Sequence, residues 1–166
     1  MFHAINTAFY VGHLKPAPGT WGSLVAVLVG WAIEHFLGHA GFPVLAVLTV
    51  VVTALGFYTV GQELKDRPGD DPGEIVIDEV AGQWLALLFP AMGFWMRDVP
   101  MVWPGPVAAF LLFRLFDIWK PWLVGRADRR GDAPGVMLDD LWAGLFAGVV
   151  SVMLAGLYHA VLEPML

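Results

Sequence analysis

Five apolar blocks separated by polar segments limit the folds that this chain can adopt. They cover residues 23–37, 42–60, 80–96, 99–116 and 141–162. A helix needs about 20 mostly apolar residues to cross the hydrocarbon core of a bilayer, with a range of roughly 17–25, and the second, third and fifth blocks reach that range. The first and fourth are weaker, because Glu34 interrupts one, and three prolines and Arg114 interrupt the other. The pattern predicts an all-α, polytopic membrane bundle of about five transmembrane or membrane-embedded helices.

Composition agrees with a single integral-membrane domain over residues 1–166. Hydrophobic residues make up 58% of the chain and charged residues only 14%, whereas an ordinary soluble domain is about 25% charged. The absence of Cys excludes thiol catalysis, disulfides and thiolate metal sites, so any metal must bind oxygen or histidine. A formal net charge of −6 argues against a nucleic-acid partner, which usually requires a basic surface.

The distribution of basic residues predicts the topology. If all five blocks cross the membrane, seven of the nine Lys and Arg residues fall on one side, and such an excess marks the cytoplasmic side. The N-terminus is therefore expected in the cytoplasm and the C-terminus outside. Eleven of the fifteen acidic residues share that side, so a site built from them should face the cytoplasm. The seven basic residues are Lys15, Lys65, Arg67, Lys120, Arg126, Arg129 and Arg130.

Two pairs of carboxylates stand directly before apolar blocks, Asp78 with Glu79 and Asp139 with Asp140. Both pairs are expected at helix N-termini, where the helix dipole favours negative charge, so capping is one interpretation. Each pair is followed by small residues, in "DEVAG" and "DDLWAG", which let membrane helices approach closely. Four converging carboxylates would repel one another, whereas a hard divalent cation would neutralise them. Because the ligands are oxygens, this second interpretation favours Mg²⁺ over Zn²⁺.

The stretch "FRLFDIWKPW", residues 113–122, carries two cations and an acid at the expected cytoplasmic edge. Arg114 and Asp117 are three residues apart, as are Asp117 and Lys120, so all three share a helical face. Pro121 should end that helix just past Lys120. The cations are candidate phosphate ligands, although Lys and Arg also anchor helix ends at the interface. Arg114 lies about one turn deeper, where an ionisable group usually faces a partner or a polar cavity.

A turn rich in Pro and Gly, "KPAPGTWGS" at residues 15–23, precedes the first apolar block. Backbone N–H groups at such a helix start, together with the hydroxyls of Thr20 and Ser23, could cradle an anion. The same residues could equally form a helix N-cap.

Four segments in this order resemble the signature blocks of the phosphatidylglycerophosphatase A family. They are "PGTWGS" at 18–23, "DPGEIVIDEVAGQ" at 71–83, "FRLFDIWKPW" at 113–122 and "GVMLDDLWAG" at 135–144. The resemblance implies a Mg²⁺-dependent lipid phosphatase of the bacterial inner membrane, which converts phosphatidylglycerophosphate into phosphatidylglycerol. It also implies Arg114 and Lys120 as phosphate ligands. The implied acidic site consists of Asp117 and of six candidate metal ligands, Asp71, Glu74, Asp78, Glu79, Asp139 and Asp140.

Two chemistries remain open for hydrolysis of a phosphomonoester. A metal ion lowers the pKa of bound water and could make it the nucleophile, with Asp117 or Glu79 as general base; this is the favoured route. Alternatively, an Asp could attack phosphorus directly and form an aspartyl-phosphate.

Two rival functions would use the same acidic residues differently. A membrane transporter would spread its carboxylates through the depth of the membrane along a pathway. A non-catalytic membrane subunit with a cation-binding acidic cluster would not require paired acids in several polar segments. Clustering of the acids on one face favours the enzyme, with membrane lipids around it and a lipid phosphate as its substrate.

Overall fold

The computed structural model describes residues 2–65 and 72–162, and these residues form helices joined by short connections. The all-α class predicted from the sequence is confirmed over these ranges. The elements are α1 (Phe2–Asn6), η1 (Val11–His13), α2 (Pro18–Leu37), η2 (Gly38–Ala40), α3 (Gly41–Glu63), α4 (Ile77–Trp95), α5 (Gly105–Trp119), α6 (Leu123–Asp128), α7 (Ala133–Leu157) and η3 (Tyr158–Leu162).

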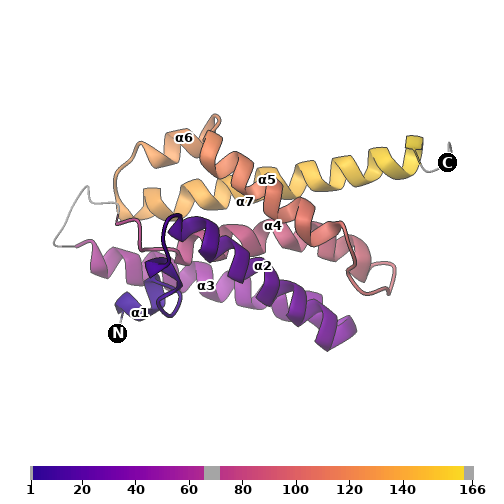
Figure 1. Cartoon of the computed structure of the whole chain (residues 1–166), viewed down its shortest axis with the longest axis horizontal. Coiled ribbons are helices and arrows are strands. Elements are labelled where there is room, and N and C mark those ends of the chain that lie inside the picture. Colours follow the sequence, from indigo (N-terminus) through magenta and orange to yellow (C-terminus); the bar gives the residue numbers. More distant parts are fainter. Residues whose placement is uncertain (1, 66–71, 163–166) are drawn as a thin grey trace.

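Two helical stretches, Pro18–Glu63 and Ala133–Ala160, are long and apolar enough to cross a membrane. The first contains α2 and α3, with 20 and 23 residues, joined through η2. Figure 1 shows these two helices side by side as a hairpin. The number of spans, about five, and the cytoplasmic N-terminus stay predictions, since length and composition alone do not establish them.

Helix α4 is the centre of the bundle and packs against α2, α3, α5 and α7 (Figure 1). Four of its apolar side chains, Ala81, Ala86, Leu87 and Ala91, are fully buried. The sequence predicts a membrane span here, but α4 is not part of either of the two helical stretches that are long and apolar enough to cross a membrane. Helix α4 has 19 residues and carries two acids in its first turn. Because it is surrounded by other helices, these ionisable groups face protein, as such groups usually do in a membrane bundle.

The start of α7 differs from the sequence prediction. The pair Asp139 and Asp140 was expected at a helix N-terminus, but α7 begins six residues earlier, at Ala133. Asp132 is the actual N-cap, because its side chain accepts a hydrogen bond of 2.8 Å from the N–H of Gly135, and Pro134 occupies the first turn, where proline is well tolerated. Capping therefore cannot explain Asp139 and Asp140.

The N-terminal helix is fixed at the end of the bundle that also carries α6. Asn6 is fully buried, accepts a hydrogen bond of 2.5 Å from the Thr59 hydroxyl and donates one to Glu63. Its carbonyl accepts a hydrogen bond of 2.8 Å from the N–H of Val76, just before α4. These contacts join α1 to α3 and to the segment that leads into the acidic start of α4.

Candidate active site

Helices α4 and α7 touch through glycine, and this contact determines where the acids lie. A Cβ atom added at Gly82 would lie 2.5 Å from the carbonyl oxygen of Asp140, and one added at Gly144 would lie 2.2 Å from the carbonyl oxygen of Gly82. Only residues without a side chain allow so close an approach. The close contact expected from the small residues after each acidic pair is confirmed, and it places Asp78 and Glu79 opposite Asp140.

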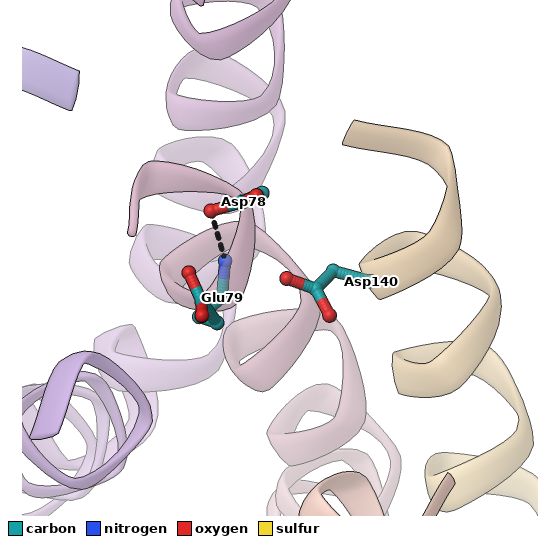
Figure 2. A group of neighbouring side chains, drawn as sticks. All are labelled: Asp78, Glu79 and Asp140. Carbon is teal, nitrogen blue, oxygen red and sulfur yellow. Dashed lines mark hydrogen bonds between the residues drawn. The ribbon is translucent and has the colours of Figure 1, made fainter. Parts of the chain in front are cut away.

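Figure 2 shows Asp78 and Glu79 on α4 with Asp140 facing them from α7. Each can offer a carboxylate oxygen, and these oxygens lie within 4.8 Å of one another. The N–H of Glu79 donates to Asp78 Oδ1 over 3.0 Å. Within the described residues, Glu79 Oε2 and Asp140 Oδ1 are buried and have no hydrogen-bond partner. Buried carboxylate oxygens without a partner are unfavourable, so the group has capacity for a cation.

These acids line a cavity of about 140 Å³ whose wall is rich in carboxyl groups. Six carboxyl groups and one ammonium group contribute to its wall. The lining residues with carboxylates are Asp78, Glu79, Asp117, Asp128, Asp139 and Asp140, and the ammonium belongs to Lys120. Oxygen-only donors of this kind suit a hard cation such as Mg²⁺, so the residues present fit the predicted metal.

Arg114 joins α5 to the start of α2. Its Nη1 lies 2.5 Å from Asp117 Oδ2 and donates to the Ser23 hydroxyl over 3.3 Å, so the predicted helical face of Arg114 and Asp117 is confirmed. A Cβ atom at Gly19 would lie 2.1 Å from Glu79 Oε1 and 3.4 Å from Arg114 Nη1. The guanidinium therefore stands next to the carboxylate cluster.

Residues 18–23 of the candidate anion-binding turn form the start of α2. Helix α2 begins at Pro18. The fixed φ of proline suits the first position of a helix. Ser23 is fully buried, and its hydroxyl donates to the carbonyl of Gly19 over 2.7 Å. It therefore supports Arg114 rather than facing the cavity, while Thr20 is half-buried in the first turn.

Lys120 was predicted to share a face with Asp117, but it pairs with other acids. Its Nζ lies 2.8 Å from Asp139 Oδ2 and also contacts Asp128. Partial burial lowers the pKa of Lys120, but hydrogen bonds and charge from Asp128 and Asp139 outweigh that effect, so the pKa lies above its ordinary value. Helix α5 ends at Trp119, as expected from Pro121, and Lys120 turns out of the helix with φ 49°.

Asp128 lines the cavity, although no motif in the sequence predicted it as a site residue. No helical periodicity links it to Lys120, because a turn separates α5 from α6. The only signal in the sequence was an acid eight residues after a candidate phosphate ligand.

One of the six predicted metal ligands is described by the structure but lies outside the cavity wall. Glu74 is half-buried before α4 and does not line the cavity, and Asp71 lies outside the described residues. Asp139 lines the cavity but holds Lys120. The close group is thus Asp78, Glu79 and Asp140.

A family model described as phosphatidylglycerophosphatase A matches residues 4–155. The chain belongs to the phosphatidylglycerophosphatase A family. A phosphatidylglycerophosphatase A from Haemophilus influenzae is 33% identical over 150 residues, which cover 89% of this chain and 85% of that protein. The phosphatidylglycerophosphatase A of Escherichia coli is 33% identical over 151 residues, covering 90% of this chain and 81% of that protein. This membership identifies the chain as an enzyme, a phosphatidylglycerophosphatase.

A third relative carries a different name. A putative phosphatidylinositol-3-phosphatase of Bacteroides thetaiotaomicron is 36% identical over 151 residues, which cover 88% of both chains. No solved structure matches the chain significantly. The relatives of this chain are therefore named for two lipid phosphates.

Proposed function

We propose that this member of the family is a Mg²⁺-dependent phosphatase that acts on phosphatidylglycerophosphate at the cytoplasmic face of the bacterial inner membrane. Family membership supports the activity. The proposed metal and the proposed location of the site rest on the cavity where the acids of α4 and α7 meet. There, one carboxylate oxygen of Glu79 and one of Asp140 are buried without a hydrogen-bond partner.

Asp78, Glu79 and Asp140 would hold the cation, since their oxygens already lie within 4.8 Å of one another. When bound, Mg²⁺ supplies positive charge for the phosphate oxygens and makes water more acidic. Asp139 is the candidate further ligand, because it lines the same cavity from the adjacent position on α7.

Arg114 and Lys120 would bind the phosphate dianion. Lys120 lines the cavity, and Arg114 is paired with the lining residue Asp117. Charge-assisted hydrogen bonds from such groups stabilise a transferring phosphoryl group. Each now holds a carboxylate, so phosphate oxygens would share these donors with Asp117 and Asp139.

Asp117 is the candidate general base, because it lines the cavity and Arg114 fixes its orientation. Water attacks phosphorus and gives its proton to the carboxylate, while the bond from phosphorus to the glycerol oxygen breaks. The leaving glycerol oxygen takes up the proton that the Asp117 carboxylate accepted, which gives phosphatidylglycerol and inorganic phosphate and regenerates the base. If Asp attacked phosphorus instead, acid quenching during turnover would leave labelled phosphate on the protein; the water route leaves none.

The deciding experiment is an assay of purified protein in detergent or vesicles. Phosphatidylglycerophosphate, phosphatidylinositol 3-phosphate and phosphatidic acid should be tested with Mg²⁺ and with chelator. We expect phosphate release from the first lipid at the highest kcat/KM, and only with Mg²⁺. Full turnover in chelator would exclude the metal, and a preference for the inositol lipid would transfer the assignment to the activity named for the Bacteroides relative.

The cytoplasmic location has its own test, because the chain contains no Cys. A single cysteine at Gly131, which lines the cavity, can be labelled with an impermeant thiol reagent. In inverted vesicles position 131 should react, and in intact cells it should not. Labelling of position 131 from outside would overturn the proposed orientation.

A further inference from the structure

The turn between α5 and α6 has an unusual backbone. Lys120 and Trp122 have φ values of 49° and 42°, with Pro121 between them. Residues other than glycine rarely adopt positive φ, and such conformations persist only where their surroundings hold them in place. The turn joins α5 to the short helix α6 (Leu123–Asp128), which packs against α7.

Gly125 allows α6 to press against that turn. A Cβ atom at Gly125 would lie 2.5 Å from the carbonyl oxygen of Lys120, so any other residue would move α6 away. Asp128 is three residues further along α6, about one helical turn. The close approach at Gly125 therefore brings the Asp128 carboxylate back to the ammonium group of Lys120.

The two acids that hold Lys120 differ in their surroundings. The Asp139 side chain is 11% exposed and belongs to the inner wall of the cavity, while that of Asp128 is 39% exposed at its rim. An ammonium group has three N–H donors, and these two carboxylates use two of them. Asp139 is also a candidate cation ligand, so its hold on Lys120 would weaken when it turns to the cation.

We propose that Asp128 is a positioning residue, which keeps the Lys120 ammonium at the cavity rim with one donor available to the phosphate. Asp128 itself touches neither substrate nor cation. The turn, Gly125 and α6 together deliver this carboxylate. The proposal rests on the proposed role of Lys120 in phosphate binding.

The test is a double-mutant cycle of Asp128→Asn and Lys120→Gln. Asp128→Asn should raise KM for the lipid phosphate about fivefold, since a pair this exposed contributes modestly, and should leave kcat and the Mg²⁺ concentration for half-maximal activity unchanged. Asp128→Glu, which keeps the charge, should restore most of the affinity. In the Lys120→Gln protein, Asp128→Asn should have no further effect, because its only target is gone.

Two further variants control for loss of structure. Asp132→Asn removes a nearby exposed charge but keeps a good cap residue, so KM should stay at the wild-type value. Gly125→Ala should displace α6 and raise KM as Asp128→Asn does. Thermal unfolding of every variant should be measured beside the rates.

The outcomes distinguish a failure of the positioning role of Asp128 from a failure of the proposed phosphate-binding role of Lys120. If Lys120→Gln is active with normal KM, the phosphate role of Lys120 fails. If Lys120→Gln raises KM but Asp128→Asn does not, or if Asp128→Asn has the same effect in both backgrounds, the positioning role of Asp128 is wrong.

Discussion

The two sides of the cavity differ in whether their acidic side chains form salt bridges. On the side where α4 crosses α7, no Lys or Arg of the described residues lies within ion-pair distance of the acids, and two carboxylate oxygens have no partner. On the side formed by α5, α6 and the neighbouring turn of α7, every acid holds a cation. The acids of the first side, called here the α4 side, are Asp78, Glu79 and Asp140. Those of the second, the α5 side, are Asp117, Asp128 and Asp139.

This difference indicates that the two sides of the proposed site have different roles. Acids without a counter-ion in a buried position would repel one another, so the α4 side is suited to a divalent cation. Acids that already hold Arg114 or Lys120 keep those groups near the cavity without binding an anion themselves. Variants on the two sides should therefore change different quantities, the Mg²⁺ requirement on one and phosphate affinity on the other.

The largest effect is expected from Asp140→Asn on the α4 side. Loss of one group that stabilises the transition state electrostatically lowers rates by about 10²–10³-fold, so kcat should fall by roughly that factor. Mg²⁺ should raise the unfolding temperature of the wild type, because it binds the folded state, and this rise should shrink in the variant. Rates and thermal unfolding at several Mg²⁺ concentrations measure both.

The matched control is Asp98→Asn, an exposed acid between α4 and α5 that pairs with His39. It should leave both quantities unchanged. If Asp140→Asn kept wild-type turnover and the same response to Mg²⁺, the cation would not bind on the α4 side.

Next in size is Gly144→Ala, which tests the helix contact that assembles the α4 side. The added methyl group has no room beside the Gly82 carbonyl. Overpacking typically costs about 1–3 kcal/mol, and a displacement near 1 Å in an active site can cost roughly 10²-fold in rate. Gly156→Ala on the same helix is the control, since nothing lies within 4 Å of that position. Equal unfolding temperatures and rates for the two variants would contradict the contact.

The sequence was most informative where site residues are close together in the chain. The start of α4 at Asp78 and Glu79, and the pairing of Arg114 with Asp117, follow from local rules of capping and helical spacing. The glycine after each acidic pair also predicted the contact of α4 with α7, because small residues permit close packing.

The features that the sequence did not reveal depend on turns or on packing. Helix α7 starts at Ala133 because Asp132 caps it, but the charged pair Asp139 and Asp140 interrupts the apolar run, so the block used to predict the helix began only at Leu141. The pairing of Lys120 with Asp128 requires a turn with two positive-φ residues, which no periodic pattern encodes. The buried role of Ser23 likewise depends on Arg114, 91 residues away.

On the α5 side, Lys120→Gln should lower kcat/KM by about 10- to 150-fold, because a hydrogen bond to a charged group contributes about 1.5–3 kcal/mol. The Mg²⁺ requirement should hardly change. Arg114→Lys should also impair phosphate binding, since an ammonium loses the two-pronged match of a guanidinium to phosphate oxygens. Initial rates over a matrix of lipid and Mg²⁺ concentrations test both. Wild-type kinetics in both variants would show that these cations only anchor the protein at the membrane interface.

The smallest effect is expected at Asp132, an acid that caps a helix and lines neither side of the cavity. Asp132→Ala removes the cap of α7 and should destabilise the protein by about 1 kcal/mol, with kcat and the Mg²⁺ requirement unchanged. A hydrogen bond from Arg130 holds the pKa of Asp132 below its usual range. The ionised cap therefore stabilises the fold above the unfolded-state pKa, near 4, and this contribution is lost as pH falls through the lower folded-state pKa. Denaturant unfolding of wild type and variant at pH 7 and at about pH 3 should show the difference shrinking in acid. A fall in kcat without a fall in stability would place Asp132 among the acids of the site, and the division between capping and cavity carboxylates would then be wrong.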